Sequence, residues 1–338
     1  MSLAQTIQDA WNRQAKWLIL LRPLSCLYAA AFQLNKQLYL KGIKKRYVAP
    51  VPVMVIGNIT VGGSGKTPLL IQLVKYLQQQ HIRVGVISRG YGGQGPFPKK
   101  VTLASIPQQV GDEPCLIVQN TEVPMVVGPN RQASIELLLQ DHVLDLIISD
   151  DGLQHWALQR QIEWIVLDQN RGLGNQRLLP EGYLREPISR LQQSTVIEHG
   201  FEPQSDLHMH LQVAKPYLLN PWDDRSELFD ADLDYYAVVG IGYPQRFYNT
   251  LESIQIKRFQ CHEFPDHYDY ELDDLQFEDD MPIITTEKDA VKIWALIKDQ
   301  ADYRRQIWVV PVEACLSEAC YTLFNQQLEK LGIHIPSA

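Results

Sequence analysis

The sequence predicts an α/β protein in which helices cover both faces of a parallel β-sheet, together with a second, smaller α/β/α unit. Short apolar runs without charge recur along the chain and alternate with segments whose apolar residues have helical spacing. Such runs are typical of parallel strands that are buried on both faces. The alternation starts again at residues 236–241, which indicates the second unit. With 338 residues, 45% of them hydrophobic, the chain is long enough for two cores.

Residues 1–50 form a basic and apolar arm on an otherwise acidic chain. They carry eight Lys and Arg residues against one acid, Asp9, whereas the whole chain has a net charge of −8. After Pro23, which suits the first turn of a helix, leucines recur on one helical face. The uncharged run 23–35 has 13 residues, fewer than the roughly 20 that span a bilayer. We expect two amphipathic helices that lie on an anionic membrane surface rather than on nucleic acid; the alternative is a helical hairpin packed on the protein itself.

The segment 51–68, VPVMVIGNITVGGSGKTP, joins a buried strand to a helix through a glycine-rich turn. The turn consists of Thr60, Val61, Gly62, Gly63, Ser64, Gly65, Lys66 and Thr67. Its glycines let successive amides point into one concavity, and the helix that follows adds the positive end of its dipole. This is the pattern of a P-loop, in which Lys66 contacts the nucleotide phosphates and the Thr67 hydroxyl ligates Mg²⁺. Thr60 stands where the strict GxxxxGK[ST] pattern has glycine, and a chance glycine linker is the alternative.

Two later loops carry charged side chains at places where α/β sheets bind ligands. The strand 82–87 ends in SRGYGG, so Arg89 can contact a phosphate or an acidic substrate, with a solvated loop arginine as the alternative. Asp112 and Glu113 lie at the start of a helix, where capping explains them without catalysis.

The apolar run 144–149 ends in Asp150-Asp151-Gly152 and resembles the second acidic motif of P-loop enzymes. Two adjacent carboxylates beside a developing phosphate charge repel it unless a cation is present, so the pair implies a metal; a simple Asp-Gly turn is the alternative.

The remaining segments point less specifically to a function. The loop 171–187 is long and has no strand pattern, which suggests a lid or substrate loop. His267 lies beside an aspartate, but a lone histidine is more often a packed residue than a catalyst. Five cysteines without paired spacing fit a reducing compartment. We divide the chain into a helical arm of the N-terminal domain (1–46), a P-loop domain (47–205) and a smaller α/β domain that closes over the phosphate-binding site (206–338).

Taken together, the loops resemble those of the tetraacyldisaccharide 4'-kinases, the inner-membrane kinases of lipid A biosynthesis in Gram-negative bacteria. The matching motifs, in the family's order, are GNITVGGSGKTP, SRGYGG, VGDEP, DDGLQH, RGLGN…LLP…LREP, GIGYPQRF, FPDH and TEKDAVK. They run from about residue 50 to residue 292, and the family shares Thr60 and the apolar basic arm. Glu181 and Tyr183 stand where the family commonly has Ala and Pro.

The resemblance implies transfer of the ATP γ-phosphate to the 4'-hydroxyl of a tetraacyldisaccharide 1-phosphate, with Mg²⁺ as cofactor. By position, Lys66 and Thr67 hold the phosphate and the metal. Asp150 and Asp151 match the acidic pair near the metal, and Glu186 matches another acid in that neighbourhood. Asp112 matches the proposed general base and His267 its partner, while Arg89 neutralises phosphate charge.

The same resemblance implies a peripheral enzyme at the cytoplasmic face of the inner membrane, with a lipid substrate and no obligate protein partner. Two other functions use the same P-loop and acidic pair. One is a soluble kinase of a small polar metabolite, and the other is a membrane-surface ATPase switch.

Overall fold

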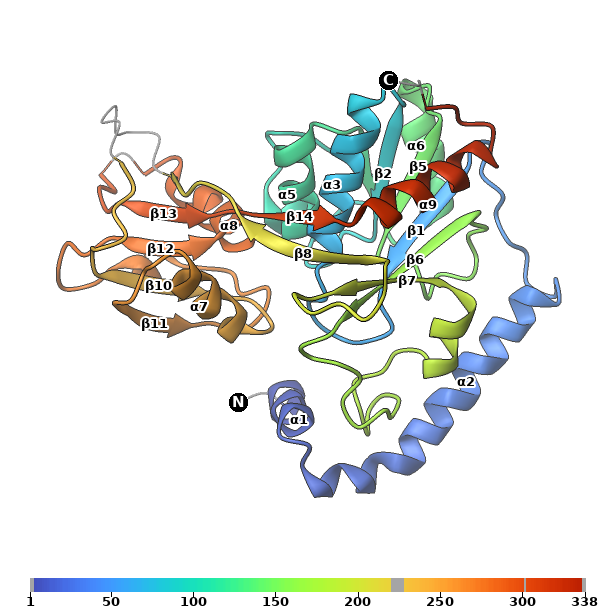
Figure 1. Cartoon of the computed structure of the whole chain (residues 1–338), viewed down its shortest axis with the longest axis horizontal. Coiled ribbons are helices and arrows are strands. Elements are labelled where there is room, and N and C mark those ends of the chain that lie inside the picture. The colour runs from blue at the N-terminus through green and yellow to red at the C-terminus, as the bar shows by residue number, and fades with distance from the viewer. Residues whose placement is uncertain (1–2, 220–227, 301, 336–338) are drawn as a thin grey trace.

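Two β-sheets with helices packed against them make up the protein (Figure 1). The structure is a computed structural model, and it describes residues 3–219, 228–300 and 302–335. Within these residues the larger sheet consists of β1 (Val53–Gly57), β2 (Val84–Ser88), β3 (Lys99–Val101), β4 (Met125–Val127), β5 (Leu146–Asp150), β6 (Ile162–Asp168), β7 (Thr195–His199), β8 (His208–Val213) and β14 (Val312–Leu316). Their order in the sheet is β14–β8–β7–β6–β1–β5–β2–β4–β3.

The central strands are buried, and they are apolar except at the carboxyl ends of β2 and β5, where Ser88, Ser149 and Asp150 lie. Every residue of β1, β2 and β5 is buried, and β1 pairs in parallel with both β5 and β6. Antiparallel pairs occur at the edges, where β3 meets β4 and β14 meets β8. This arrangement confirms the predicted parallel α/β sheet.

Helices cover both faces of the larger sheet. The helices after β1 to β4 are α3 (Lys66–Gln79), α4 (Pro107–Val110), α5 (Asp112–Thr121) and α6 (Arg131–Asp141), and α9 (Glu318–Glu329) follows β14. On one face, Leu73 of α3, Ile117 of α5 and Phe324 of α9 share one core. On the other face, Ile135 and Leu138 of α6 pack against a second core. The loops that leave the carboxyl ends of β1, β2 and β5 therefore meet at one edge of the sheet.

The smaller sheet has the order β11–β10–β12–β13–β9 and is parallel except for its edge strand β9. Its strands are β9 (Tyr217–Leu218), β10 (Tyr235–Val239), β11 (Phe259–Glu263), β12 (Ile283–Thr286) and β13 (Ile307–Val310). It carries the helices α7 (Pro244–Ser253) and α8 (Glu287–Ile297), with a short 3₁₀ turn at Leu272–Leu275. Separate cores lie on its two faces, one containing Trp308 and the other Ile293.

The membership of the two sheets corrects the expected domain boundary at residue 206. Strand β8 pairs in parallel with β7, and the C-terminal strand β14 returns to pair with β8, so that both belong to the larger sheet. Figure 1 shows β8 and β14 side by side between the two sheets. Helix α9 then packs on the larger core, where Phe324 meets Trp164 edge-on with ring centroids 5.4 Å apart. The local sequence pattern does not show which sheet these segments join, because their pairing partners lie far away along the chain.

The N-terminal arm consists of α1 (Leu3–Asn12), a 3₁₀ turn (Lys16–Leu21) and α2 (Arg22–Leu40), and Figure 1 shows α2 along the outside of the larger unit. By length and composition alone, the helical stretch Lys16–Leu40 is long and apolar enough to cross a membrane. Large apolar side chains such as Leu20 and Leu27 are exposed, at 76% and 67%. The arm therefore presents an apolar surface that the protein itself does not cover.

The position of α9 gives the first prediction. We expect Phe324→Ala to lower the free energy of unfolding by about 3–5 kcal/mol, because the ring is fully buried between Trp164 and Tyr76. Urea denaturation measures the change, and the exposed Gln326→Ala on the same helix is the matched control. Equal stability of the two variants would show that α9 does not pack on the larger core.

Candidate active site

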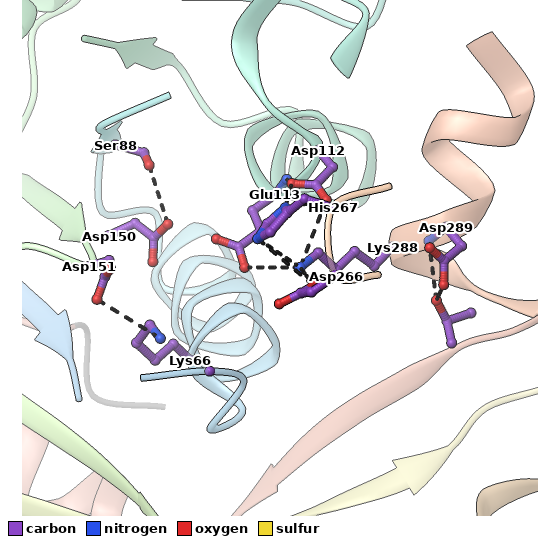
Figure 2. A network of polar contacts seen from close by, with 12 residues as sticks. Lys66, Ser88, Asp112, Glu113, Asp150, Asp151, Asp266, His267, Lys288 and Asp289 are labelled. Carbon is purple, nitrogen blue, oxygen red and sulfur yellow. Dashed lines mark hydrogen bonds and ion pairs between the residues drawn. The ribbon is translucent and has the colours of Figure 1, made fainter. Parts of the chain in front are cut away.

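A cavity of about 890 Å³ lies between the carboxyl edge of the larger sheet and the smaller unit. Charged and polar side chains from both units line it: Lys66, Ser88, Arg89, Glu113, Arg131, Asp150, Asp151, Gln154, His155, Arg185, Asp266, His267 and Lys288. Figure 2 shows Lys66, Asp150 and Asp151 from the larger unit on one side and His267 and Lys288 from the smaller unit on the other. Four of the residues predicted from the loops, Lys66, Arg89, Asp150 and Asp151, thus face the same space as His267.

The glycine turn after β1 has the backbone of a phosphate-binding loop. Gly62 and Gly65 have φ values of +97° and +92°, in the left-handed region that favours glycine. Gly65 also immediately precedes α3, and a Cβ there would lie 2.8 Å from His199 Nδ1. His199 Nδ1 also forms a hydrogen bond with the carbonyl oxygen of Ser64 at 2.9 Å, so that His199 holds the backbone of the loop in place. The amides at the start of α3 therefore remain available for an anion.

Thr60 has a structural reason to differ from glycine. It forms an isolated antiparallel bridge with Leu184, an extended geometry that any residue adopts. Its hydroxyl accepts a hydrogen bond from Asn58 Nδ2 at 3.3 Å, and its carbonyl oxygen accepts one from Arg185 Nε at 3.0 Å. The threonine therefore ties the loop to residue 184 and residue 185 instead of making a left-handed turn.

The two adjacent carboxylates at the end of β5 have different environments. Burial, with Glu113 and Asp151 nearby, raises the pKa of Asp150 to about 7. Its Oδ2 accepts a hydrogen bond from Ser88 Oγ at 3.4 Å, whereas its Oδ1 has no partner among the described residues. Burial would also raise the pKa of Asp151, but the charges of Lys66 and Arg185, at 3.9 and 2.9 Å, outweigh it and lower the pKa.

This donor set fits Mg²⁺ better than a metal that needs a closed protein cage. Within the residues that the structure describes, no group of three or more His, Cys, Asp or Glu side chains is placed to hold a metal. Mg²⁺ commonly binds through one or two carboxylates and takes its other ligands from substrate phosphates and water. The buried Oδ1 of Asp150 without a partner is the atom that such a cation would satisfy.

A second charged cluster joins the two units across the cavity. His267 Nδ1 lies 2.9 and 3.1 Å from the two carboxylate oxygens of Asp112, at the start of α5. Lys288, at the start of α8, places its Nζ 3.0 Å from Asp266 Oδ1, 3.4 Å from His267 Nε2 and 3.8 Å from both Asp112 Oδ2 and Glu113 Oε1. The structure thus brings Asp112 and His267 together from segments 155 residues apart.

The ionisation of this cluster follows from its geometry. Burial would raise the pKa of Asp112, but the hydrogen bond with His267 and the charge of Lys288 outweigh it and lower the pKa to about 2. Burial would lower the pKa of His267, but its hydrogen bond with Asp112 raises it. Burial would likewise lower the pKa of Lys288, whereas the charges of Glu113, Asp112 and Asp266 raise it. At neutral pH, Asp112 is therefore an anion that lies between His267 and the Lys288 ammonium.

Some predicted residues do not line the cavity. Glu186 is fully buried, and its carboxylate accepts hydrogen bonds from Gln154 Nε2 at 2.9 Å and Arg190 Nε at 3.2 Å. Thr67 lies in the first turn of α3 without lining the cavity, and Asp112 lies behind His267. The loop 171–187, expected to be a lid or substrate loop, instead packs beside the P-loop, where Tyr183 O accepts a hydrogen bond from Val61 N at 2.9 Å.

Sequence reasoning missed Arg131, Arg185 and Lys288. Arg131 begins α6 and is buried, and its Nε has no partner among the described residues. Burial lowers the pKa of Arg131 to about 10 despite the nearby acidic pair. Lys288 lies two residues after the parallel strand β12. This position could have identified Lys288 as a site residue, because ligands bind at the carboxyl ends of parallel strands. No spacing signal separates Arg131 and Arg185 from ordinary surface arginines.

Comparisons with known proteins agree on one family. A family model described as "Tetraacyldisaccharide-1-P 4'-kinase" matches residues 17–329. A "Tetraacyldisaccharide 4'-kinase" of Psychrobacter cryohalolentis is 49% identical over 99% of both chains, and that of Pseudomonas putida is 41% identical over 98% of both. The solved structure of LpxK from Aquifex aeolicus in complex with ATP has a TM-score of 0.75 and 28% identity, and the match covers 93% of this chain and 99% of that one.

Two of the three glycines of the turn, Gly63 and Gly65, give a prediction for the free protein. We expect Gly65→Ala to lower the free energy of unfolding by about 1–3 kcal/mol, because of its positive φ and the close approach of His199. Gly63→Ala is the matched control, since its φ is ordinary and a Cβ there meets nothing within 4 Å. Urea denaturation without nucleotide measures both; a stable Gly65→Ala variant would contradict this loop geometry.

Proposed function

The chain belongs to the tetraacyldisaccharide-1-P 4'-kinase family, and we infer that it is the ATP-dependent kinase that phosphorylates the 4'-hydroxyl of tetraacyldisaccharide 1-phosphate in lipid A biosynthesis. The observation that carries this inference is a single cavity lined by the P-loop lysine, the acidic pair and His267. A nucleotide phosphate and a sugar hydroxyl can meet there from opposite sides. The following residue roles are our proposal for how this site works.

The turn Thr60–Thr67 binds the phosphates of ATP. Backbone amides and the amino-terminal end of α3 face the anion, and Lys66 adds a charge at the β- and γ-phosphates. The buried ammonium of Lys66 already lies 3.9 Å from Asp151, at the border between the phosphate loop and the acidic pair. Arg89 and Arg131, also on the cavity wall, are placed to neutralise charge on the transferred group.

Asp150, Asp151 and the Thr67 hydroxyl would hold Mg²⁺. When bound, the ion neutralises phosphate charge and orients the terminal phosphate. Glu186 does not reach the cavity itself, so we assign it an indirect role: it holds Gln154, which lines the cavity.

The Asp112–His267 pair receives the proton of the sugar hydroxyl. A carboxylate whose pKa is about 2 is too weak a base to remove this proton before the reaction begins. In the loose transition state of phosphoryl transfer the hydroxyl becomes acidic only as its bond to phosphorus forms. Because Asp112 does not itself line the cavity, we assign it to orienting the hydroxyl and accepting its proton late, once movement of the smaller unit has uncovered its carboxylate, with His267 holding that carboxylate. Since the two residues come from different units, movement of the smaller unit would open this side of the cavity to the lipid.

The arm places this site at a membrane surface. Its exposed leucines and basic residues suit the boundary between acyl chains and anionic headgroups. A substrate with four acyl chains remains in the bilayer, so an enzyme that lies on that surface meets it by diffusion in two dimensions. We propose peripheral attachment at the cytoplasmic face of the inner membrane, which agrees with the free cysteines among the described residues.

A transfer assay tests the reaction and its base. With γ-labelled ATP, Mg²⁺ and disaccharide 1-phosphate lipid, we expect the wild type to label the lipid and to hydrolyse little ATP without it. Asp112→Ala should lower kcat by about 100- to 10,000-fold while ATP binding remains, because the carboxylate contacts no part of the phosphate loop. The exposed Asp269→Ala is the control. If Asp112→Ala retains normal turnover, the base has been misassigned.

The raised pKa of His267 gives a pH prediction with a definite sign. His267 faces Asp112, Asp266, Lys288 and the ring of Tyr91. The charge on protonated His267 stabilises the folded protein. This contribution to stability is fully present below the ordinary pKa of 6.5 and is lost as pH rises through the higher pKa of His267 in the folded state. Asp112 stays ionised throughout, because its pKa is about 2. Urea unfolding from pH 5.5 to 9 should therefore show a larger loss of stability in the wild type than in His267→Asn; parallel curves would contradict the ion pair.

A further inference from the structure

Helix α2 contacts the rest of the protein through polar groups on its inner side. Ser25 is buried; its hydroxyl donates to the carbonyl oxygen of Leu178 at 3.0 Å and accepts from the amide of Glu181 at 2.8 Å. Arg22 donates to the buried carboxylate of Glu181 through Nη2 at 2.8 Å and through Nε at 3.1 Å. One turn further along, the hydroxyl of Tyr28 donates to the carbonyl oxygen of Arg185 at 2.8 Å. All five hydrogen bonds end on the loop 171–187.

The side chain of Arg185 connects this loop to the phosphate site. Its guanidinium donates to the carbonyl oxygen of Thr60 at 3.0 Å and to the Asp151 carboxylate at 2.9 Å. A third bond, at 2.8 Å, reaches Asn58 Oδ1, and Asn58 itself donates to the carbonyl oxygen of Gly62. One side chain thus fixes the start of the glycine turn and one of the two adjacent carboxylates.

We propose that Tyr28 and Ser25 are positioning residues for phosphoryl transfer, which hold the backbone of the loop 171–187 so that Arg185 keeps Thr60 and Asp151 in place. The proposal rests on the function inferred above. It gives the arm a second task, because the outer side of α2 carries the exposed leucines while its inner side supports the phosphate site.

Attachment of the arm alone would not require these contacts. A helix on a protein surface is held well by apolar packing, yet at positions 22, 25 and 28 the contacts are hydrogen bonds to backbone groups and one buried carboxylate. Hydrogen bonds are directional, so they fix the position of the loop backbone and not only its proximity to the helix. The Tyr28 bond ends on the same residue whose side chain contacts Asp151. A small shift of that backbone moves the guanidinium relative to the phosphate site, and misplacement of this kind lowers the rate without abolishing binding.

Tyr28→Phe tests the proposal because it removes one hydroxyl and leaves the apolar surface intact. We expect kcat on detergent-dispersed lipid to fall about three- to tenfold, with the KM for lipid and the melting temperature unchanged. Sedimentation with vesicles of phosphatidylethanolamine and phosphatidylglycerol should remain as in the wild type. Tyr39→Phe is the matched control, since Tyr39 lies on the same helix and its ring contacts Lys44 instead of the loop.

Ser25→Ala provides a second, independent variant that also retains the arm. It should lower kcat in the same way, because two bonds to the loop are lost. The proposal is overturned if both variants turn over as fast as the wild type, or if kcat falls only in proportion to vesicle binding. A wild type that transfers no phosphate to the lipid would overturn the proposed function instead.

Discussion

The packing of opposite charges at the carboxyl edge of the larger sheet is the constraint on which the site depends. The parallel strand β5 delivers Asp150 and Asp151 to a place where burial disfavours two anions, and Asp150 has its pKa raised to about 7 as a result. Lys66 and Arg185 keep Asp151 ionised. Asp151 already neutralises part of the charge of Lys66 and Arg185 before a phosphate binds. The two carboxylates of the acidic pair in turn have too little positive charge beside them, because Asp150 Oδ1 has no partner among the described residues. This charge balance supports the proposal that the site binds a phosphate and a cation together, since either one alone leaves the charge unbalanced.

Opposite charges also lie at the contact between the smaller and the larger unit. The side chains that face each other across the cavity form ionic contacts: Lys288 lies among Asp112, Glu113 and Asp266, and Arg246 of α7 pairs with Asp168 at the end of β6. In addition, Val291 of α8 packs into the core of the larger unit. Ionic contacts near solvent contribute less than apolar ones and separate at modest cost. The two strands β8 and β14 are the continuous connection between the units, whereas the cavity side is held by groups that water can also satisfy. Such a contact suits a cavity that must admit a lipid headgroup and then exclude water.

Strands and loops that depend on neighbouring residues could be predicted well from the sequence. Contacts between residues far apart along the chain could be predicted less well. Buried apolar runs located β1, β2 and β5, and the glycine turn with Lys66 identified the phosphate loop, because spacing along the chain encodes both. The return of β14 to the larger sheet could not be read in this way. His267 illustrates the same limit for the site: its spacing argued against function, and only the resemblance singled it out before the fold placed it against Asp112. Gln154, one partner of Glu186, also lies 32 residues away along the chain, a separation that no spacing rule covers.

The arm shows why composition alone does not decide between spanning a membrane and lying on it. The stretch Lys16–Leu40 is long enough to cross, yet α2 is held along its length by Arg22 on Glu181 and by Lys36, whose Nζ lies 4.9 Å from the ring centre of Trp156. Moving either cation to the bilayer centre would cost about 2.5–3.5 kcal/mol in addition to the lost contacts. Glu181, which differs from the Ala common in the family, is buried and ion-paired because Arg22 lies beside it. Helix α2 is tied to the loop 171–187 on one side and exposes leucines on the other, and this arrangement supports the proposed attachment at a membrane surface over a helix that spans the bilayer.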